Sequence, residues 1–343
     1  MSIVRMSIPI VAAALALVGN SASAEEPVWQ AMLGDLPKTE KAGFGGLCGI
    51  CVDHATGTVV VNISDRGFYR STDAAKTFKR MSDTQPKGRT EEPGCLLIDP
   101  TGKTKTLLTA LVYGAPIGAS SDEGATWKTM NGKSSHIDWC AVDWTDPDRK
   151  FVLALKHESG GTLIVSRDGG ASFSEIGKGY GTGWVFNATT AVVAEAKTKD
   201  RPKPNLMRTT DAGQTWKSCG AYSPVGVNSA QALPKSYDGS LYWLVDGGLI
   251  ATNDAGETWK KVCDLKNARY GPIFGKDARH MFVLTAGGIL ETTDGGTAWS
   301  KPITVPKDLR GTGGPTWLEY DPTSDAIYIM KMGSDLFKLS RAK

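Results

Sequence analysis

The chain has 343 residues, 22% of them charged, and a formal net charge of only +3 at pH 7. Basic and acidic residues are interspersed, so the composition does not favour a nucleic-acid partner. Forty glycines and the lack of a long 3.6-residue apolar period are typical of an all-β protein built from short strands and turns.

The first residues have the pattern of a secretory signal peptide. Arg5 precedes an apolar run at residues 8–18, and Ala22-Ser23-Ala24 has the small residues of a cleavage site. The run is too short to span a bilayer, and no later segment reaches eighteen apolar residues. We therefore expect a secreted or periplasmic protein without a membrane span, in which residues 1–24 are the signal peptide and residues 25–343 form a single domain.

One phrase then recurs six times: a Ser or Thr, any residue, an Asp, two or three small residues, and then a Thr or Ser and an aromatic residue. The Asp carboxylate of such a phrase can accept hydrogen bonds from the amides of its own turn, and the aromatic residue can anchor the next strand. We expect the six aspartates to be structural rather than catalytic. They are Asp73, Asp122, Asp168, Asp211, Asp254 and Asp294.

The phrase, from residues 71–78 to residues 292–299, resembles the Asp-box, or bacterial neuraminidase (BNR) repeat, of sialidase-like β-propellers. The likeness covers nearly the whole chain after residue 24. It implies a propeller fold, and it implies that the boxes lie away from the ligand site.

The spacing of the repeats also predicts blades. Successive box aspartates are 49, 46, 43, 43 and 40 residues apart, a period typical of four short strands per unit. After the sixth box, residues 317–321, 326–330 and 336–340 supply three strands of a seventh unit. Residues 28–33 resemble an outer strand and can complete it. We therefore expect a seven-bladed β-propeller whose ring is closed by the N-terminal strand.

Functional residues are expected on the face opposite the boxes, where the blade-joining loops and the loops between second and third strands emerge. These loops include Tyr113, residues 135–138 and residues 156–158. A Pro-broken polar insertion at residues 195–204 is expected to be an exposed loop. Ordinary solvated loop residues are the alternative for each of them. The predicted ligand-binding residues are Arg89, Trp184, Arg269, Tyr270 and Arg310, because arginines suit an anionic group and aromatic rings suit stacking.

The resemblance to sialidases has a clear departure. That family uses three arginines, a Tyr–Glu pair and an Asp, but its Arg-Ile-Pro signature is absent, and the corresponding stretch runs from Lys41 to Gly46. No carboxylate pair can be assigned from spacing alone. Two hypotheses remain: an exported propeller that binds a glycan or a protein segment without catalysis, and a glycoside hydrolase. Neither calls for a cofactor or a metal, and we expect a monomer.

Six cysteines add a further open question, because an oxidising compartment permits disulfides. Cys48 and Cys51 have the spacing of a redox or metal motif, but no second such pair exists. Cys48 and Cys95 fall at similar heights on successive inner strands, so a bridge between them is sterically conceivable. The sequence does not choose among the pairings.

Overall fold

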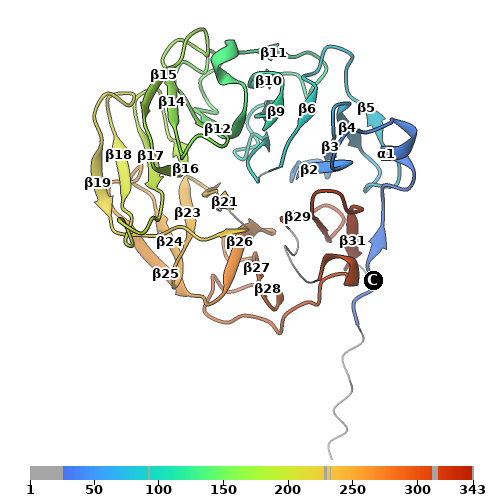
Figure 1. Ribbon diagram of the computed structural model, residues 1–343. Coiled ribbons are helices and arrows are strands. Elements are labelled where there is room, and N and C mark those ends of the chain that lie inside the picture. Colours follow the sequence, from blue (N-terminus) through green and yellow to red (C-terminus); the bar gives the residue numbers. More distant parts are fainter. Residues whose placement is uncertain (1–25, 92, 228–229, 232, 311–315, 342–343) are drawn as a thin grey trace, which may run out of the picture.

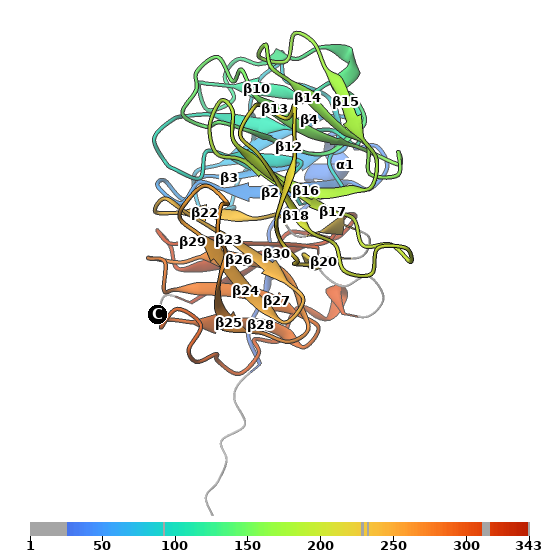
Figure 2. The same ribbon diagram turned by 90° about the vertical axis from the view of Figure 1, so that its left-hand side faces the viewer.

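The computed structural model describes residues 26–341 except 92, 228–229, 232 and 311–315, so the predicted signal peptide lies outside the described residues. The chain is a seven-bladed β-propeller, as predicted. Seen along its axis, it forms a ring of small sheets in sequence order, with the first and last blades side by side (Figure 1). Turned by 90°, the ring is seen from its side (Figure 2).

The first four blades are each antiparallel sheets of four strands that run outward from the central axis in chain order. Blade 1 is β2 (Leu47–Val52), β3 (Val59–Ile63), β4 (Gly67–Ser71) and β5 (Lys79–Arg80); blade 2 is β7 (Leu96–Ile98), β8 (Leu107–Thr109), β10 (Gly118–Ser120) and β11 (Lys128–Thr129); blade 3 is β12 (Ile137–Val142), β13 (Val152–Lys156), β14 (Leu163–Ser166) and β15 (Ser174–Gly177); blade 4 is β16 (Tyr180–Val185), β17 (Ala191–Glu195), β18 (Leu206–Thr209) and β19 (Lys217–Gly220).

The remaining blades follow the same order. Blade 5 is β22 (Lys235–Tyr237), β23 (Ser240–Val245), β24 (Gly248–Thr252) and β25 (Lys260–Asp264); blade 6 is β26 (Ala268–Phe274), β27 (Met281–Thr285) and β28 (Gly288–Thr292); blade 7 is β29 (Trp317–Asp321), β30 (Ala326–Met330), β31 (Phe337–Ser340) and the N-terminal β1 (Gln30–Ala31). Outside the blades lie the paired strands β6 (Gly88–Arg89) with β9 (Tyr113–Gly114) and β20 (Gly226–Val227) with β21 (Ala230–Gln231), helix α1 (Leu36–Thr39) and two 3-10 turns, η1 (Gly132–Ser134) and η2 (Lys307–Leu309).

Apolar residues on both faces of the strands hold neighbouring blades together. In β12, Cys140 and Val142 pack against blade 2, whereas Trp139 and Ala141 pack against blade 4. This alternation follows from the two-residue period of a strand, and it explains why residues 139–142 are apolar on both faces of β12. Within the described residues, seven such clusters occupy the seven interfaces between blades.

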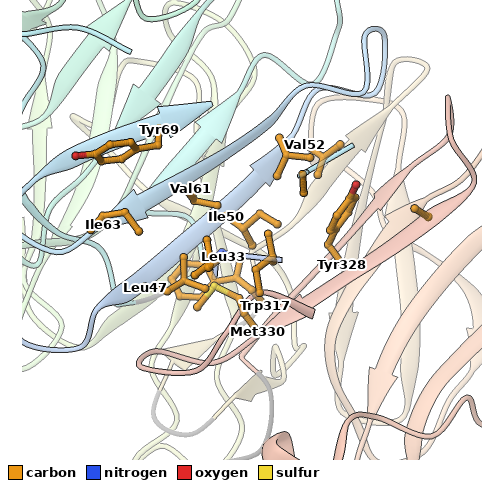
Figure 3. Close-up of a cluster of buried hydrophobic side chains, with 14 residues drawn as sticks. Leu33, Leu47, Ile50, Val52, Val61, Ile63, Tyr69, Trp317, Tyr328 and Met330 are labelled. Carbon is orange, nitrogen blue, oxygen red and sulfur yellow. The ribbon is translucent and has the colours of Figure 1, made fainter. Parts of the chain in front are cut away.

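The N-terminal strand closes the ring. Gln30 pairs with Lys338 and Ala31 with Phe337, and the amide of Met32 continues the ladder to the carbonyl of Leu336 at 2.9 Å. The closing interface between blades 7 and 1 buries Leu33, Ile50, Trp317, Tyr328 and Met330 in one cluster (Figure 3). The predicted outer strand over residues 28–33 is therefore confirmed, with regular pairing confined to its centre.

The six turns that carry the repeated phrase, called here the repeat turns, share one hydrogen-bond network. In the first, the hydroxyl of Ser71 donates to Asp73 at 2.6 Å, while the amide and hydroxyl of Thr77 donate to the same carboxylate at 2.9 and 2.7 Å. Equivalent bonds from the leading hydroxyl and from the amide four residues after the Asp recur around Asp122, Asp168, Asp211, Asp254 and Asp294. The aspartates are thus fully engaged within their own turns.

These bonds stabilise the charged form of each carboxyl group. Hydrogen bonds from the side chains of Thr126 and Ser172 above all lower the pKa of Asp122 and of Asp168 to about 2. The pKa of each of the other four carboxyl groups is likewise below its usual value.

The strand register separates the repeat turns from the predicted ligand face. In blade 3, Val152 pairs with Val142 and with Ser166, the residue that opens a repeat turn. Lys156 pairs with Ile137 at the other end of the same strands. The loop after Lys156 and the linker before Ile137 therefore emerge opposite the repeat turn, on what we call the funnel face.

The conceivable bridge between Cys48 and Cys95 is not formed, since Cys48 is a free thiol buried in β2. The Sγ atom of Cys95 lies 2.9 Å from the carbonyl oxygen of Asp138 instead. Within the described ranges, no helix is long and apolar enough to cross a membrane, and no group of His, Cys, Asp and Glu residues has an arrangement that could hold a metal ion.

Candidate functional site

The structure does not gather the five predicted ligand-binding residues into one pocket. Arg310 is exposed, donates from Nε to the carbonyl oxygen of Val305 at 3.0 Å, and lines a pocket of about 270 Å³ that also contains Trp29. Arg89 lies elsewhere, in the linker between blades 1 and 2, and none of the five lines the larger pocket described below. Their role in binding stays a prediction.

The two aromatic residues of the predicted set contribute to packing. Tyr270 is only 1% exposed, in the cluster between blades 6 and 7, with Nζ of Lys235 at 5.4 Å from its ring centroid. Trp184 is half-buried against the cluster between blades 2 and 3 and the cluster between blades 4 and 5, and Arg269 is half-buried in β26. Tyr270 therefore offers little surface to a ligand.

Arg89 has a different environment, which the short β6–β9 ladder creates. In that ladder Arg89 pairs directly with Tyr113, and its Cζ atom lies 4.2 Å from the Tyr113 ring centroid. The same guanidinium lies 4.9 Å from the ring centroid of Phe44 and forms an ion pair with Glu91. A planar guanidinium between two rings is a favourable cation–π arrangement, and it holds both rings in place.

Tyr113 also connects Arg89 to a pair of residues from blade 3. Its ring meets His157 edge-on at 5.3 Å, and its hydroxyl donates to Glu158 at 3.3 Å. Nδ1 of His157 lies 2.6 Å from Oδ1 of Asp138, and Nε2 lies 3.7 Å from Oε1 of Glu158. Burial raises the pKa of Asp138, although contact with His157 acts in the opposite direction.

Backbone hydrogen bonds join these loops to one another. The amide of Val112 donates to the carbonyl of Arg89 at 3.0 Å, that of Ile137 to Leu111 at 3.0 Å, and that of His157 to His136 at 2.7 Å. Each bond joins residues more than 20 positions apart. The side chains of the site are therefore preorganised by main-chain contacts rather than by the flexible loops alone.

Beside this cluster lies a pocket of about 460 Å³ between blades 3 and 4, on the funnel face. Its floor includes Trp139, whose Nε1 donates to the carbonyl of Gly181 at 3.1 Å, and its wall includes Tyr180. Its lining residues are Pro93 and residues 138–139, 155–161, 180–182 and 196–197. The predicted insertion at residues 195–204 is largely exposed and supplies one rim of the pocket.

The pocket combines aromatic faces with hydrogen-bonding groups of both kinds. Asp138 and Glu158 are the carboxyl groups among its described lining residues, and Lys156 and Lys197 are the ammonium groups. Lys197 is already in contact with Asp246, at 3.1 Å. Such a mixture of convergent polar groups beside ring surfaces is typical of a site for a polar organic ligand.

Four residues of the cluster lie on the face that the sequence predicts for function but are not among the predicted ligand-binding residues: Tyr113, Asp138, His157 and Glu158. The two contacts that define the cluster, Arg89 with Tyr113 and His157 with Asp138, join residues 24 and 19 positions apart and leave no local pattern. Phe44 was a missed signal, because an aromatic residue between glycines ahead of a blade is free to present its ring.

No protein-family model and no curated protein matches the chain. Solved structures of propellers are similar to it. The GH74 enzyme of Niastella koreensis is 17% identical with a TM-score of 0.57; the match covers 87% of this chain and 43% of that one, so the chain spans less than half of the enzyme. The WD40 domain of Neurospora crassa Pan2 is 9% identical with a TM-score of 0.55, covering 93% and 98%.

The protein YCF48 from Cyanidioschyzon merolae is also similar, at 11% identity and a TM-score of 0.50, with 91% of this chain and 98% of that chain covered. At such identities the likeness shows the fold alone. Because propellers host many unrelated functions, the function has to be argued from the site.

Proposed function

We propose that this protein is an exported binding protein of the Asp-box type that takes a glycan or a protein segment into the pocket between blades 3 and 4, without catalysis. In this proposal residues 1–24 direct export, and the propeller of residues 25–343 acts as a monomer. The observation that carries the proposal is the pocket itself, where the His157–Asp138 pair and Tyr180 converge on the face opposite the repeat turns.

The arrangement of carboxyl groups favours binding over hydrolysis. Glycoside hydrolases typically hold two carboxyl groups about 5 to 9.5 Å apart, with the scissile bond between them. Here Asp138 and Glu158 both face the same imidazole, one at Nδ1 and the other at Nε2 of His157. The ring of His157 thus occupies the space that a scissile bond would need.

The test compares two histidines of similar chemistry. Arrays of glycans and of peptides identify ligands for the wild-type protein, and calorimetry then measures their affinity for His157→Ala and Asp138→Asn. His280→Ala is the matched control, because His280 is 12% exposed and contacts Glu291 at 2.8 Å, but lies at the repeat-turn end of blade 6.

We expect each of the two pocket variants to weaken binding about tenfold or more, the cost of losing a charge-assisted hydrogen bond, and the control to bind normally. Binding that is unchanged in both pocket variants contradicts the proposal. A panel of fluorogenic glycosides tests the alternative, a glycoside hydrolase. Turnover by the wild type that disappears in Asp138→Asn or Glu158→Gln would show that the protein is a hydrolase.

A further inference from the structure

Phe44 presents an aromatic ring to solvent at the edge of the site. It is 69% exposed, a value otherwise unusual among the large apolar side chains that the structure describes. The ring is nevertheless held from behind by the guanidinium of Arg89, at 4.9 Å from its centroid. Gly45 and Gly46, both with positive φ, turn the chain away and leave the ring uncovered. An exposed ring on a fixed support is typical of a stacking platform.

This platform is continuous with the pocket. Arg89 lies 4.2 Å from the Tyr113 ring, Tyr113 lies 5.3 Å from the His157 ring, and His157 contacts Asp138 in the pocket wall. The contacts cross from the linker ahead of blade 1 to blade 3. A ligand that occupies the pocket and also reaches Phe44 must therefore be longer than a single ring or side chain.

The charges along this path are of both signs. Arg89 is paired with Glu91, and the pocket lining holds the carboxyl groups of Asp138 and Glu158 together with the ammonium groups of Lys156 and of Lys197, which also contacts Asp246. An acidic ligand would meet Asp138 and Glu158, and a basic ligand would meet Lys156 and Lys197. Like charges brought together in a partly buried site are unfavourable, so the site suits an uncharged ligand with many donors and acceptors.

Several main-chain amides along the path are already paired. Those of His157, Gly179 and Tyr180 donate to carbonyls of neighbouring loops at 2.7 to 3.1 Å. An extended peptide is commonly recognised through free backbone groups of its receptor. A glycan needs side-chain donors, acceptors and ring faces instead, which this path supplies.

We infer that the ligand is a neutral oligosaccharide of several units, with one end in the pocket and a later sugar stacked on Phe44. The inference rests on the proposed function, because it names the ligand class of the same site. Sugar hydroxyls exchange hydrogen bonds with three side chains of the pocket: Asp138, His157 and Glu158. Phe44 determines the preference for chain length.

The experiment uses the full protein on an array of neutral and uronic-acid-containing oligosaccharides of two to eight units, together with a peptide array. Phe44→Ala is compared with Val262→Ala, which shortens another exposed apolar side chain on a distant blade. We expect neutral chains to bind and affinity to rise with length. Phe44→Ala should abolish this rise in affinity, which amounts to about a tenfold loss for the longest chains. Short chains should bind the wild type and Phe44→Ala equally.

A preference for acidic glycans, or a Phe44→Ala protein that keeps the full length dependence, overturns the inference. Peptide binding without glycan binding also overturns it, and if that binding is lost in His157→Ala the proposed binding function survives. Absence of both glycan and peptide binding refutes both. Because Phe44 is exposed, its variant should melt at the wild-type temperature, so lost binding is not mistaken for unfolding.

Discussion

Arg89 and Tyr113 face each other in register across the β6–β9 ladder, with the guanidinium carbon 4.2 Å from the ring centroid. The ladder lies outside the blade sheets and joins the linker between blades 1 and 2 to the loop after β8. It thereby turns two loops from different repeats into one rigid surface. Phe44 and His157 both depend on this pair, since each contacts one of its members.

Closing the ring with the N-terminal strand should govern stability. Deleting residues 25–34 removes the buried side chain of Leu33 and the partner of β31, and it exposes the edge of blade 7. We expect the free energy of unfolding to fall by on the order of 5 kcal/mol, from lost apolar burial and lost pairing. Urea unfolding of the truncated protein measures this loss.

Val28→Ala is the control for the truncation, because Val28 belongs to the same segment but is 77% exposed. It should unfold like the wild type. If the truncated protein unfolds at the same urea concentration as the wild type, the N-terminal strand does not contribute to the stability of the ring.

The ring could be predicted from the sequence because its signals are local and repeated. Each repeat turn forms its hydrogen bonds between residues two to four positions apart, as from Ser71 and from Thr77 to Asp73, so the pattern is visible in the sequence. In strands such as β12, successive residues face opposite sides of the sheet, so the face of each apolar residue also follows from its position in the local sequence. Topology then orders the blades and assigns each loop to a face.

The site could not be predicted in the same way, because the face of a loop does not fix the direction of a side chain. In β26 the register shifts around Tyr270, between Ala268 and Ile273, and Tyr270 points into the interface between blades. Arg310 is on a linker as expected, but lies beside Trp29 rather than near Arg89. Distances across the ring and rotations within a strand are tertiary properties.

The contribution of each repeat turn to stability should depend on whether the residue four positions after the Asp has a hydroxyl group. Asp254 accepts hydrogen bonds from both the amide and the hydroxyl of Thr258, whereas Ala298 offers Asp294 only its amide. We therefore expect Asp254→Ala to lower the melting temperature more than Asp294→Ala does. Differential scanning calorimetry at pH 7 gives the comparison.

The acid dependence of the same variants checks the cause. Hydrogen bonds lower the pKa of Asp254 in the folded state, so its stabilisation is present above the unfolded value near 3.8 and is lost as the pH falls below it. The gap between wild type and Asp254→Ala should narrow from pH 5 toward pH 2. Asp83→Ala, whose side chain is fully exposed, serves as control. Equal melting of all four proteins at pH 7 would contradict the structural role.

Glu319 should make stability depend on pH near neutrality. This β29 residue is 8% exposed, and burial raises the pKa of its carboxyl group to about 7, although nearby Lys235 acts against the shift. A carboxyl group with a raised pKa favours the folded state below its unfolded value near 4.5, and this contribution is lost as the pH rises through 7. The free energy of unfolding of the wild type should fall by about 3 kcal/mol between pH 4.5 and 8. The Glu319→Gln protein should not show this fall.

Urea unfolding at intervals between pH 4.5 and 8 measures how the free energy of unfolding changes with pH in the wild type and in Glu319→Gln. Glu158→Gln is the control, because its side chain is 74% exposed and should leave the slope unchanged. Parallel curves for wild type and Glu319→Gln would show that the carboxyl group is solvated or titrates outside this range.

Arg89 and Arg310 provide the sharpest comparison between the sequence-based hypothesis and the proposed site. If arginines grip an anionic ligand, as their positions in the sequence suggested, Arg89→Ala and Arg310→Ala should weaken binding alike. The structure gives them different surroundings: Arg89 supports Phe44 and Tyr113 and is neutralised by Glu91, whereas Arg310 bonds a carbonyl oxygen in a separate pocket. For a neutral oligosaccharide we expect Arg89→Ala to weaken long chains about tenfold and Arg310→Ala to have no effect.

Arg89→Lys separates charge from shape in this test. Lysine keeps the positive charge but lacks the planar group that lies between two rings, so it should behave like Arg89→Ala if stacking is the cause. Calorimetry with the longest oligosaccharide that binds the wild type gives the affinities, and melting temperatures confirm folding. Full affinity in Arg89→Lys, or a loss in Arg310→Ala as large as in Arg89→Ala, would restore charge as the basis of recognition.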